Sequence, residues 1–213
     1  MSTVCSRLHQ MIQRLPLHRF PFDSEAIPRN GIYVLFEKGE TAHGANRIIR
    51  VGTHRGDDQL RSRLAQHLMW EKKDRSIFRK NIGRALLNRD GDPFLEQWEL
   101  DLTTRKAREQ YGNLIDTRKQ AETERQVTEY LQGNISFVVF RVDNRDERLV
   151  WESKIISTVA QCQECKPSTT WLGRHSPKQK IRESGLWLVN ELEGQPISQS
   201  ELELLEEMVI ASR

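Results

Sequence analysis

This sequence of 213 residues has few cysteines, and it has neither a long apolar run nor an apolar leader segment. Its three cysteines, Cys5, Cys162 and Cys165, are too few for a disulfide framework and indicate a reducing compartment, so we expect a cytoplasmic protein. No apolar run approaches the roughly 18–20 residues that cross a bilayer, and we therefore expect no membrane association. The N-terminus also lacks the apolar core of a signal peptide, which argues against secretion.

Charge of one sign is not in large excess, because the formal net charge is only +3. The basic residues are nevertheless concentrated between residues 47 and 89, as Arg47, Arg50, Arg55, Arg61, Arg63, Lys72, Lys73, Arg75, Arg79, Lys80, Arg84 and Arg89. The tail from Glu191 is acidic by contrast. A local basic field of this kind suits a polyanion such as nucleic acid, and a solvated helix face rich in arginine is the alternative.

Three segments carry the pattern of strands: residues 32–37, 47–52 and 135–142. We expect the first two to form an antiparallel hairpin with a long polar loop between them. With helices between and after them, the fold class is α/β (α+β): a small, mainly antiparallel three-stranded sheet flanked by helices. A helical insertion at about 75–132 separates the second strand from the third.

The helices are predicted from apolar spacing and from capping residues. After an amphipathic N-terminal helix, a helix over about 59–69 would be capped by Asp57 or Asp58. A second helix is expected over 75–90 and another over about 148–162.

Two further segments of the insertion are expected to have different secondary structures. Residues 94–102 have the pattern of a short strand. Residues 103–131 are highly charged, which is typical of a long exposed helix.

Tyr33 and Arg50 are the polar residues of the two hairpin strands that are best placed for chemistry. Side chains alternate along a strand, so Tyr33 shares a face with Leu35, and Arg50 shares one with Ile48 and Gly52. We expect Tyr33 and Arg50 to face a common site, with Gly52 leaving room for a ligand.

Arg63 and His67 lie four residues apart and therefore project from one side of the predicted helix. A guanidinium binds phosphate by bidentate hydrogen bonds, and an imidazole donates to phosphate or transfers a proton near neutral pH. Glu152, placed at the start of the helix after the third strand, could hold one Mg²⁺, with Mn²⁺ as an alternative. Tyrosine is a poor base unless a nearby arginine or metal lowers its pKa.

The order of these parts resembles the GIY-YIG nuclease superfamily. Gly31-Ile32-Tyr33 is identical to the first family motif, Arg50-Val51-Gly52 aligns with the second, and residues 60–67 are similar to the helix motif. The resemblance implies a metal-dependent DNA endonuclease in which Tyr33 helps to deprotonate water, Arg63 binds phosphate and Glu152 holds the metal. Arg50 and His67 complete the implied catalytic set.

The resemblance covers roughly residues 30–165, so we expect a nuclease domain there, an N-terminal helical extension at 1–29 and a C-terminal extension at 166–213. Arg50 stands where the second motif usually has tyrosine. A nuclease-fold protein that binds nucleic acid but has lost catalysis is therefore the alternative function. The asparagine that often follows the family's glutamate has no obvious counterpart, although Ser168 or Thr169 could take its place.

Weaker signals add four possible nucleic-acid contacts, His54, Arg55, Arg174 and His175. The segment 171–187 is either such a contact surface or a lid anchored by its two terminal tryptophans. The pair Cys162-x-x-Cys165 is half of a zinc site, with His175 as a third ligand, or simply two thiols at a helix end. DNA is the expected partner. A homodimer, or sequential nicking, would be needed for a double-strand break.

Overall fold

The computed structural model describes residues 2–211, and their centre is an antiparallel sheet in the order β1-β4-β2-β3. Its strands are β1 (His18–Arg19), β2 (Ile32–Ala42), β3 (Ala45–Gly52) and β4 (Ile135–Phe140). The predicted mixed fold with an antiparallel sheet is confirmed, with one more strand than expected. The additional strand, β1, has only two residues, too few to give a periodic pattern, and it pairs with Ser136 and Phe137 of β4.

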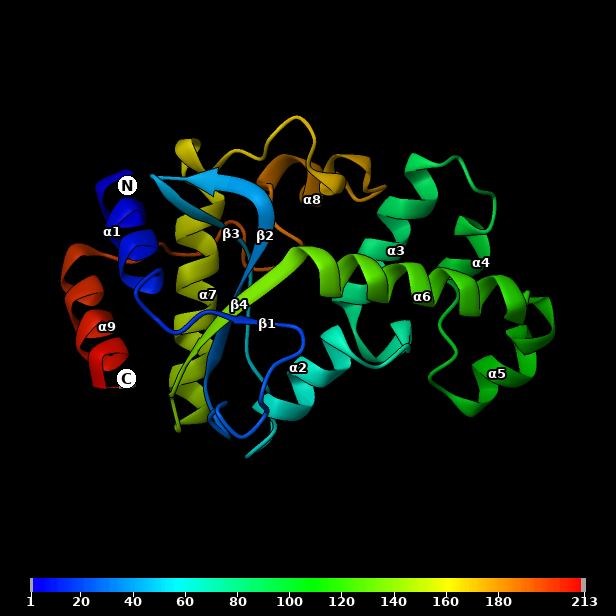
Figure 1. The fold of residues 1–213 in the computed structure, drawn as a ribbon, viewed down its shortest axis with the longest axis horizontal. Coiled ribbons are helices and arrows are strands. Elements are labelled where there is room, and N and C mark those ends of the chain that lie inside the picture. The colour runs from blue at the N-terminus through cyan, green and yellow to red at the C-terminus, as the bar shows by residue number, and fades with distance from the viewer. Residues whose placement is uncertain (1, 212–213) are drawn as a thin grey trace.

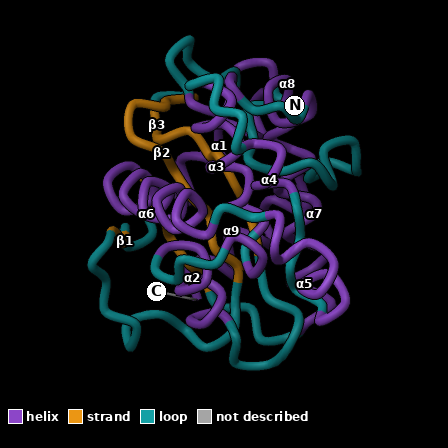
Figure 2. Tube along the Cα trace, turned by 90° about the vertical axis from the view of Figure 1, so that its right-hand side faces the viewer, coloured by secondary structure: helices purple, strands orange, loops and turns teal. Residues whose placement is uncertain are grey.

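Helices occupy most of the remaining chain, and Figures 1 and 2 show them around the strands. The α-helices are α1 (Ser2–Ile12), α2 (Leu60–Leu68), α3 (Ile77–Arg89), α4 (Leu95–Glu99), α5 (Arg105–Tyr111), α6 (Thr117–Asn134), α7 (Arg145–Ala160), α8 (Gln179–Ser184) and α9 (Gln199–Ala211). Short 3₁₀ turns are η1 (Lys73–Arg75), η2 (Gly112–Leu114), η3 (Gln163–Cys165) and η4 (Leu172–His175). Within residues 2–211, no helix has the length and apolarity to cross a bilayer.

Each face of the sheet is covered by its own set of helices (Figure 1). On one face, Ile32, Val34 and Phe36 of β2 pack in a core with α1, α7 and α9. On the other, Tyr33 and Leu35 pack in a core with α2, α3 and α6. The alternation of side chains along β2 thus sends neighbouring residues into two separate cores.

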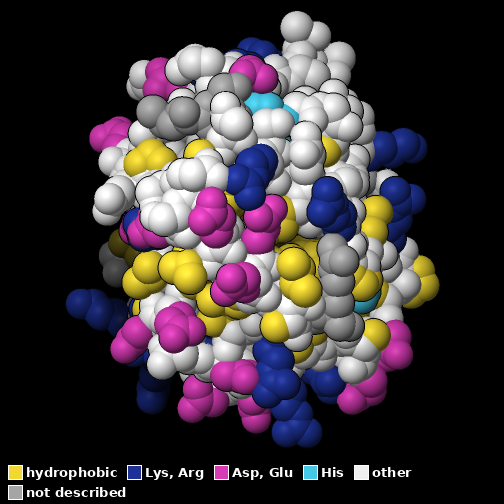
Figure 3. Space-filling view, turned by 90° about the vertical axis from the view of Figure 1, so that its left-hand side faces the viewer, with side chains coloured by type: hydrophobic (Ala, Val, Ile, Leu, Met, Phe, Trp, Pro, Cys, Tyr) yellow, Lys and Arg dark blue, Asp and Glu magenta, His cyan; other side chains and the backbone are white. Residues whose placement is uncertain are grey.

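The surface formed by α1 and α9 carries the acidic tail (Figure 3). Glu206 of α9 accepts a hydrogen bond of 2.7 Å from Arg7 of α1, and acidic, basic and hydrophobic side chains are interspersed on this face. The division into a nuclease domain and two extensions stays a prediction, although α1 and α9 both contribute to one core.

The hairpin is tighter than the expected long polar loop. Strand β2 ends at Ala42 and β3 begins at Ala45, so only His43 and Gly44 form the turn. Both have positive φ, 54° and 72°, as a two-residue type I′ hairpin requires. The sequence hid this turn because His43-Gly44 lacks the usual asparagine or aspartate.

Two expectations for the secondary structure of the insertion were wrong. Residues 95–99 form helix α4 and not a strand, because Phe94 and Trp98, four residues apart, are both buried against the same core. The predicted long helix at 103–131 is divided into α5 and α6. Asp116 precedes α6 and caps it, because its side chain accepts a hydrogen bond from the Lys119 N–H.

Neither predicted capping aspartate caps α2. Gln59 occupies the cap position without a side-chain hydrogen bond, and Asp58 instead pairs with Asn30. Glu152 does not begin its helix either: α7 starts at Arg145, and Asn144 accepts the first N–H groups. Glu152 therefore lies two turns into α7.

Candidate functional site

The two hairpin strands place Tyr33 and Arg50 on the same face of the sheet. Tyr33 pairs with Gly52, and Leu35 pairs with Arg50. The next pair is Phe36 with Ile48, so Ile49 is an additional residue that forms a bulge. The bulge turns Ile48 into the opposite core, which corrects the expectation that Ile48 and Arg50 share a face.

Tyr33 forms a buried pair with His67 of α2. Its hydroxyl oxygen lies 2.8 Å from Nε2 of His67, and Nδ1 of His67 lies 2.6 Å from Oγ of Ser76. Tyr33 and His67 are 1% and 0% exposed. A β-carbon at Gly52 would overlap the Tyr33 ring, so this glycine is what allows the ring to lie across the end of β3.

The imidazole of His67 is neutral in this environment. Burial lowers the pKa of His67 well below its usual value, and the charges of Arg63, Arg50 and Arg79 lower it further. One ring nitrogen therefore carries a proton and the other is an acceptor. With Nε2 as the acceptor, His67 can accept a hydrogen bond from the Tyr33 hydroxyl and fix its direction.

The low pKa of His67 predicts a loss of stability in acid. The unfolded chain protonates this histidine near its ordinary pKa of about 6.5, whereas the folded chain does not, so the unfolded state binds more protons below that pH. The free energy of unfolding should fall as pH decreases from 7 to 5, by at most about 1.4 kcal/mol per pH unit from this group.

The measurement is urea unfolding of the wild type and of His67→Gln across this pH range. Glu37, Glu124 and Glu152 have raised pKa values and an effect of opposite sign, but they are present in both proteins. The difference between the two proteins should therefore shrink as the pH falls. A constant difference would contradict a neutral His67.

A cleft of about 770 Å³ lies beside this pair. Three of the five residues predicted for catalysis and metal binding line it: Arg50, Arg63 and Glu152. Tyr33 and His67 do not belong to its described lining and lie beneath it. The structure thus gathers the two arginines and the carboxylate at one surface, with the Tyr33–His67 pair behind them.

Arg50 is fixed by the chain that follows α8. Its Nη1 donates to the carbonyl oxygen of Trp187 at 2.6 Å, and its guanidinium lies 5.3 Å from the centre of the Phe78 ring. Among the described residues, Nε of Arg50 has no hydrogen-bond partner although it is buried. A bound anion in the cleft would supply the acceptor that this donor lacks.

Glu152 reaches the cleft from α7 and faces the end of β3. Its Oε1 accepts a hydrogen bond of 3.1 Å from the Thr53 N–H. Burial raises the pKa of Glu152, while Arg50, the Thr53 N–H and Arg63 act in the opposite direction. A partly desolvated carboxylate opposite two arginines is a suitable anionic ligand for a divalent cation.

Arg63 is held on the cleft wall by α2 and by the turn before α3. Its Nη1 donates to Oε1 of Gln66 at 3.0 Å and to the Arg75 carbonyl oxygen at 3.1 Å. These two acceptors order a side chain that would otherwise be mobile, and a guanidinium fixed in this way can bind phosphate at a lower entropic cost.

The four weaker predictions divide into two pairs. His54 and Arg55 line the cleft, and His54 also connects the strands, because Gly31 N–H donates to its Nε2 at 3.3 Å. Arg174 instead donates to the carbonyl oxygens of Ser168 and Pro167, and His175 lines a different pocket. Only the first pair therefore lies near Glu152.

Much of the predicted basic field is buried. The side chains of Arg47, Lys73, Arg79, Lys80 and Arg84 are all less than a tenth exposed, and each has an acidic partner. Their role is to join helices to one another and to the hairpin. Both sequence-based interpretations, a phosphate-binding surface and a solvated helix face, are wrong for these five residues.

Sequence reasoning missed the part of the cleft that comes after α8. Trp187 N–H donates to the Ile49 carbonyl oxygen of β3 at 2.8 Å, and residues 187–191 form one wall of the cleft. Asn190 and Glu191 join the lining there. Ser168, considered for the missing asparagine, bonds Glu40 instead.

No motif marked this segment, but its tryptophan was a usable signal. Trp171 and Trp187 both donate their indole N–H to Oε2 of the buried Glu37, at 3.0 and 2.9 Å. The anchoring role that the sequence offered as one explanation for these two tryptophans matches their place in the structure. Anchoring Trp187 also positions Asn190 and Glu191 beside Glu152.

Comparison with known proteins adds one finding to this geometry. A family model described as the GIY-YIG domain matches residues 6–213. The comparisons with curated proteins and with solved structures give no match. The family match extends beyond the hairpin, α2 and α7 to the helical insertion and the segment that forms the last cleft wall.

Proposed function

Because the chain belongs to the GIY-YIG family, a family of endonucleases, we propose that it hydrolyses DNA phosphodiester bonds with the help of one divalent cation. Mg²⁺ is the proposed ion, with Mn²⁺ as a substitute. The observation that carries the proposal is the shared cleft of Glu152, Arg50 and Arg63. A carboxylate for the metal and two arginines for phosphate are the groups that this reaction needs.

The oxygen-bearing residues of the cleft fit a hard cation. Glu152 supplies the charge, and Ser153, Asn190 and Glu191 line the cleft beside it. Mg²⁺ prefers such oxygen ligands and retains several waters when one carboxylate holds it. When bound, the ion would polarise the phosphate and make a bound water more acidic.

Arg63 and Arg50 are proposed to bind the scissile phosphate from the opposite side of the cleft. The Nε of Arg50, which has no hydrogen-bond partner within residues 2–211, indicates an anionic acceptor, and Arg63 adds a second fixed guanidinium. Charge develops on the phosphate oxygens during cleavage, so preorganised donors lower the barrier. His54 and Arg55 extend the same surface and are proposed to contact the flanking backbone.

Tyr33 is proposed to assist water activation through its hydrogen bond to His67. The neutral imidazole of His67 accepts the hydrogen of the Tyr33 hydroxyl and so orients it, while burial and three arginines oppose the uptake of a further proton by His67. Gly52 allows the Tyr33 hydroxyl to lie at the end of β3, and the next residue of the chain, Thr53, donates its N–H to Glu152.

The test is incubation of the purified chain with plasmid DNA and with branched DNA, in Mg²⁺, in Mn²⁺ and in excess chelator. We expect nicked or linear products that require the metal and decrease strongly in Tyr33→Phe. Linear product that rises more steeply than in proportion to protein concentration would indicate a homodimer, and a nicked intermediate would indicate sequential cleavage.

A reducing cytoplasm is the proposed compartment, as the three free thiols suggest.

The alternative is a protein that binds nucleic acid without cutting it. Arg50 stands in the place of the motif tyrosine, donates to the Trp187 carbonyl oxygen and is only 5% exposed. A guanidinium has only donors, so Arg50 cannot replace a phenol as a proton acceptor. Tight binding that weakens with salt, with no cleavage of any substrate in either metal, would support this alternative and contradict the nuclease.

A further inference from the structure

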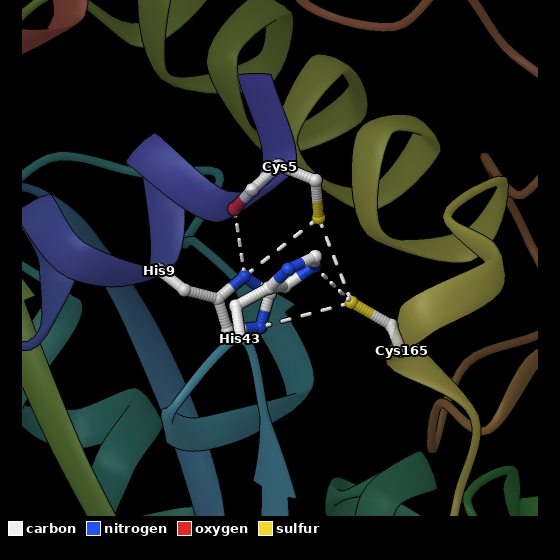
Figure 4. Close-up of side chains that lie close together, drawn as sticks. All are labelled: Cys5, His9, His43 and Cys165. Atoms are coloured by element: carbon white, nitrogen blue, oxygen red, sulfur yellow. Dashed lines mark hydrogen bonds between the residues drawn. The ribbon is translucent and has the colours of Figure 1, made fainter. Parts of the chain in front are cut away.

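A second cluster of reactive side chains lies at the other side of the sheet (Figure 4). Cys5 and His9 come from α1, His43 from the hairpin turn and Cys165 from η3. One sulfur or ring nitrogen from each residue lies within 4.8 Å of the others. All four side chains are buried, with His43 only 2% exposed at its side chain.

We propose that Cys5, His9, His43 and Cys165 bind a structural zinc ion. The proposal is independent of the nuclease activity, because none of these four residues belongs to the lining of the cleft that holds Glu152, Arg50 and Arg63. Two cysteines and two histidines form a closed tetrahedral set, and two thiolates balance the charge of Zn²⁺ in a buried place.

The spacing of the donor atoms fits a tetrahedron around one ion. Zinc–sulfur and zinc–nitrogen bonds of about 2.3 and 2.0 Å place the ligand atoms about 3.3–3.8 Å apart. The Sγ atoms of Cys5 and Cys165 are 3.5 Å apart, and Nε2 of His43 is 3.5 Å from Sγ of Cys165. Nε2 of His9 lies slightly farther from Cys165, at 3.9 Å.

Both histidines are oriented by acceptors at the opposite ring nitrogen. Nδ1 of His43 lies 3.2 Å from Oε2 of Glu164, and Nδ1 of His9 lies 2.9 Å from the Cys5 carbonyl oxygen. This turns Nε2 of both histidines toward the Cys165 sulfur, as the outer hydrogen bonds of histidine ligands do in zinc sites, whereas the Cys5 sulfur lies 3.7 Å from Nδ1 of His9. The Ile48 N–H approaches Nε2 of His9 at 3.4 Å, a long contact that a metal ion would replace.

The two sulfurs contact each other and the histidine rings, and bonds to a metal ion would take the place of these contacts. Cys162 lies 3.3 Å from Nε2 of His43 but falls outside the four-residue group. The sequence-based zinc hypothesis thus changes its ligands: Cys165 remains, and His175 is replaced by residues from α1 and the hairpin.

The experiment is elemental analysis of the untagged full chain, purified without chelator from zinc-containing medium. We expect about one zinc ion per chain, and removal by a strong chelator should lower the melting temperature by at least about 5 °C. Cobalt substitution should give the intense visible absorption of a tetrahedral site with thiolate charge-transfer bands. These measurements use the wild type and need no variant to fold.

Variants then test the ligand set. Cys165→Ser and His43→Ala should each reduce bound zinc several-fold, whereas Cys162→Ser, His175→Ala and Glu152→Gln should retain it. Folded wild type with far less than one zinc per chain and no cobalt spectrum would overturn the proposal. A Cys5–Cys165 disulfide, detected as a mass deficit of two hydrogens, would also overturn it, and loss of zinc in Cys162→Ser would overturn the assigned ligands.

Discussion

Replacing Glu152 with Gln should reduce the rate of metal-dependent DNA cleavage by about 10³-fold while the fold is retained. Glutamine keeps an oxygen that can accept the Thr53 N–H, so the local hydrogen bond at 3.1 Å survives. What is lost is the negative charge that would hold the cation opposite Arg50 and Arg63. Removing a raised-pKa carboxylate from a partly buried place also removes a desolvation cost, so the variant should not be less stable.

The measurement is single-turnover cleavage at saturating protein, with DNA binding followed separately. Glu147→Gln is the matched control, because Glu147 lies on the same helix near its exposed start and should leave the rate unchanged. DNA binding by Glu152→Gln in chelator should equal that of the wild type. A rate within a few-fold of wild type would show that the metal is held elsewhere.

Replacing Arg79 with Met should lower the free energy of unfolding by about 3–5 kcal/mol. Arg79 is fully buried and donates to the Glu124 carboxylate from Nη2 at 2.8 Å and from Nε at 3.2 Å. Its Nη1 donates to the His67 carbonyl oxygen, so one guanidinium joins α2, α3 and α6. Without it, the Glu124 carboxylate remains buried with no ion pair to Arg79 and keeps only the hydrogen bond from the Lys73 N–H.

Urea unfolding measures this loss, and two variants sharpen it. Arg105→Met removes an ion pair with Glu109 in which both side chains are largely exposed, and should change stability by less than about 0.5 kcal/mol. The double variant Arg79→Met with Glu124→Leu should recover part of the loss, because no buried charge is left without a partner. A single variant as stable as wild type would contradict the structural role of this pair.

The part of the site that the sequence predicted is local in the chain. Tyr33, Arg50, Arg63 and His67 lie within 35 residues, and strand alternation with helical spacing was enough to bring them together on one side of the sheet. The bulge at Ile49 did not alter this, because it precedes Arg50 and changes only the face of Ile48.

The remainder depended on contacts between distant segments, which no local pattern reveals. The buried ion pairs of Arg47 and Arg79 have partners 7 and 45 residues away, so their arginines looked like a charged surface. Likewise, Asn190 and Glu191 reach the cleft only because Trp187 is fixed to β3 and to Glu37. His9 and His43 meet Cys165 across more than 120 residues.

The hydrogen bond from Trp187 to Ile49 also bears on how two copies of the chain can associate. Strand β3 is at one edge of the sheet, and an open edge is a template for a strand from another molecule. The Trp187 N–H takes up one acceptor of that edge, the Ile49 carbonyl oxygen, and the opposite edge strand, β1, has only two residues. Both features disfavour sheet extension between copies. A pair of molecules cutting both strands of a duplex would meet more readily through helices or through the DNA itself.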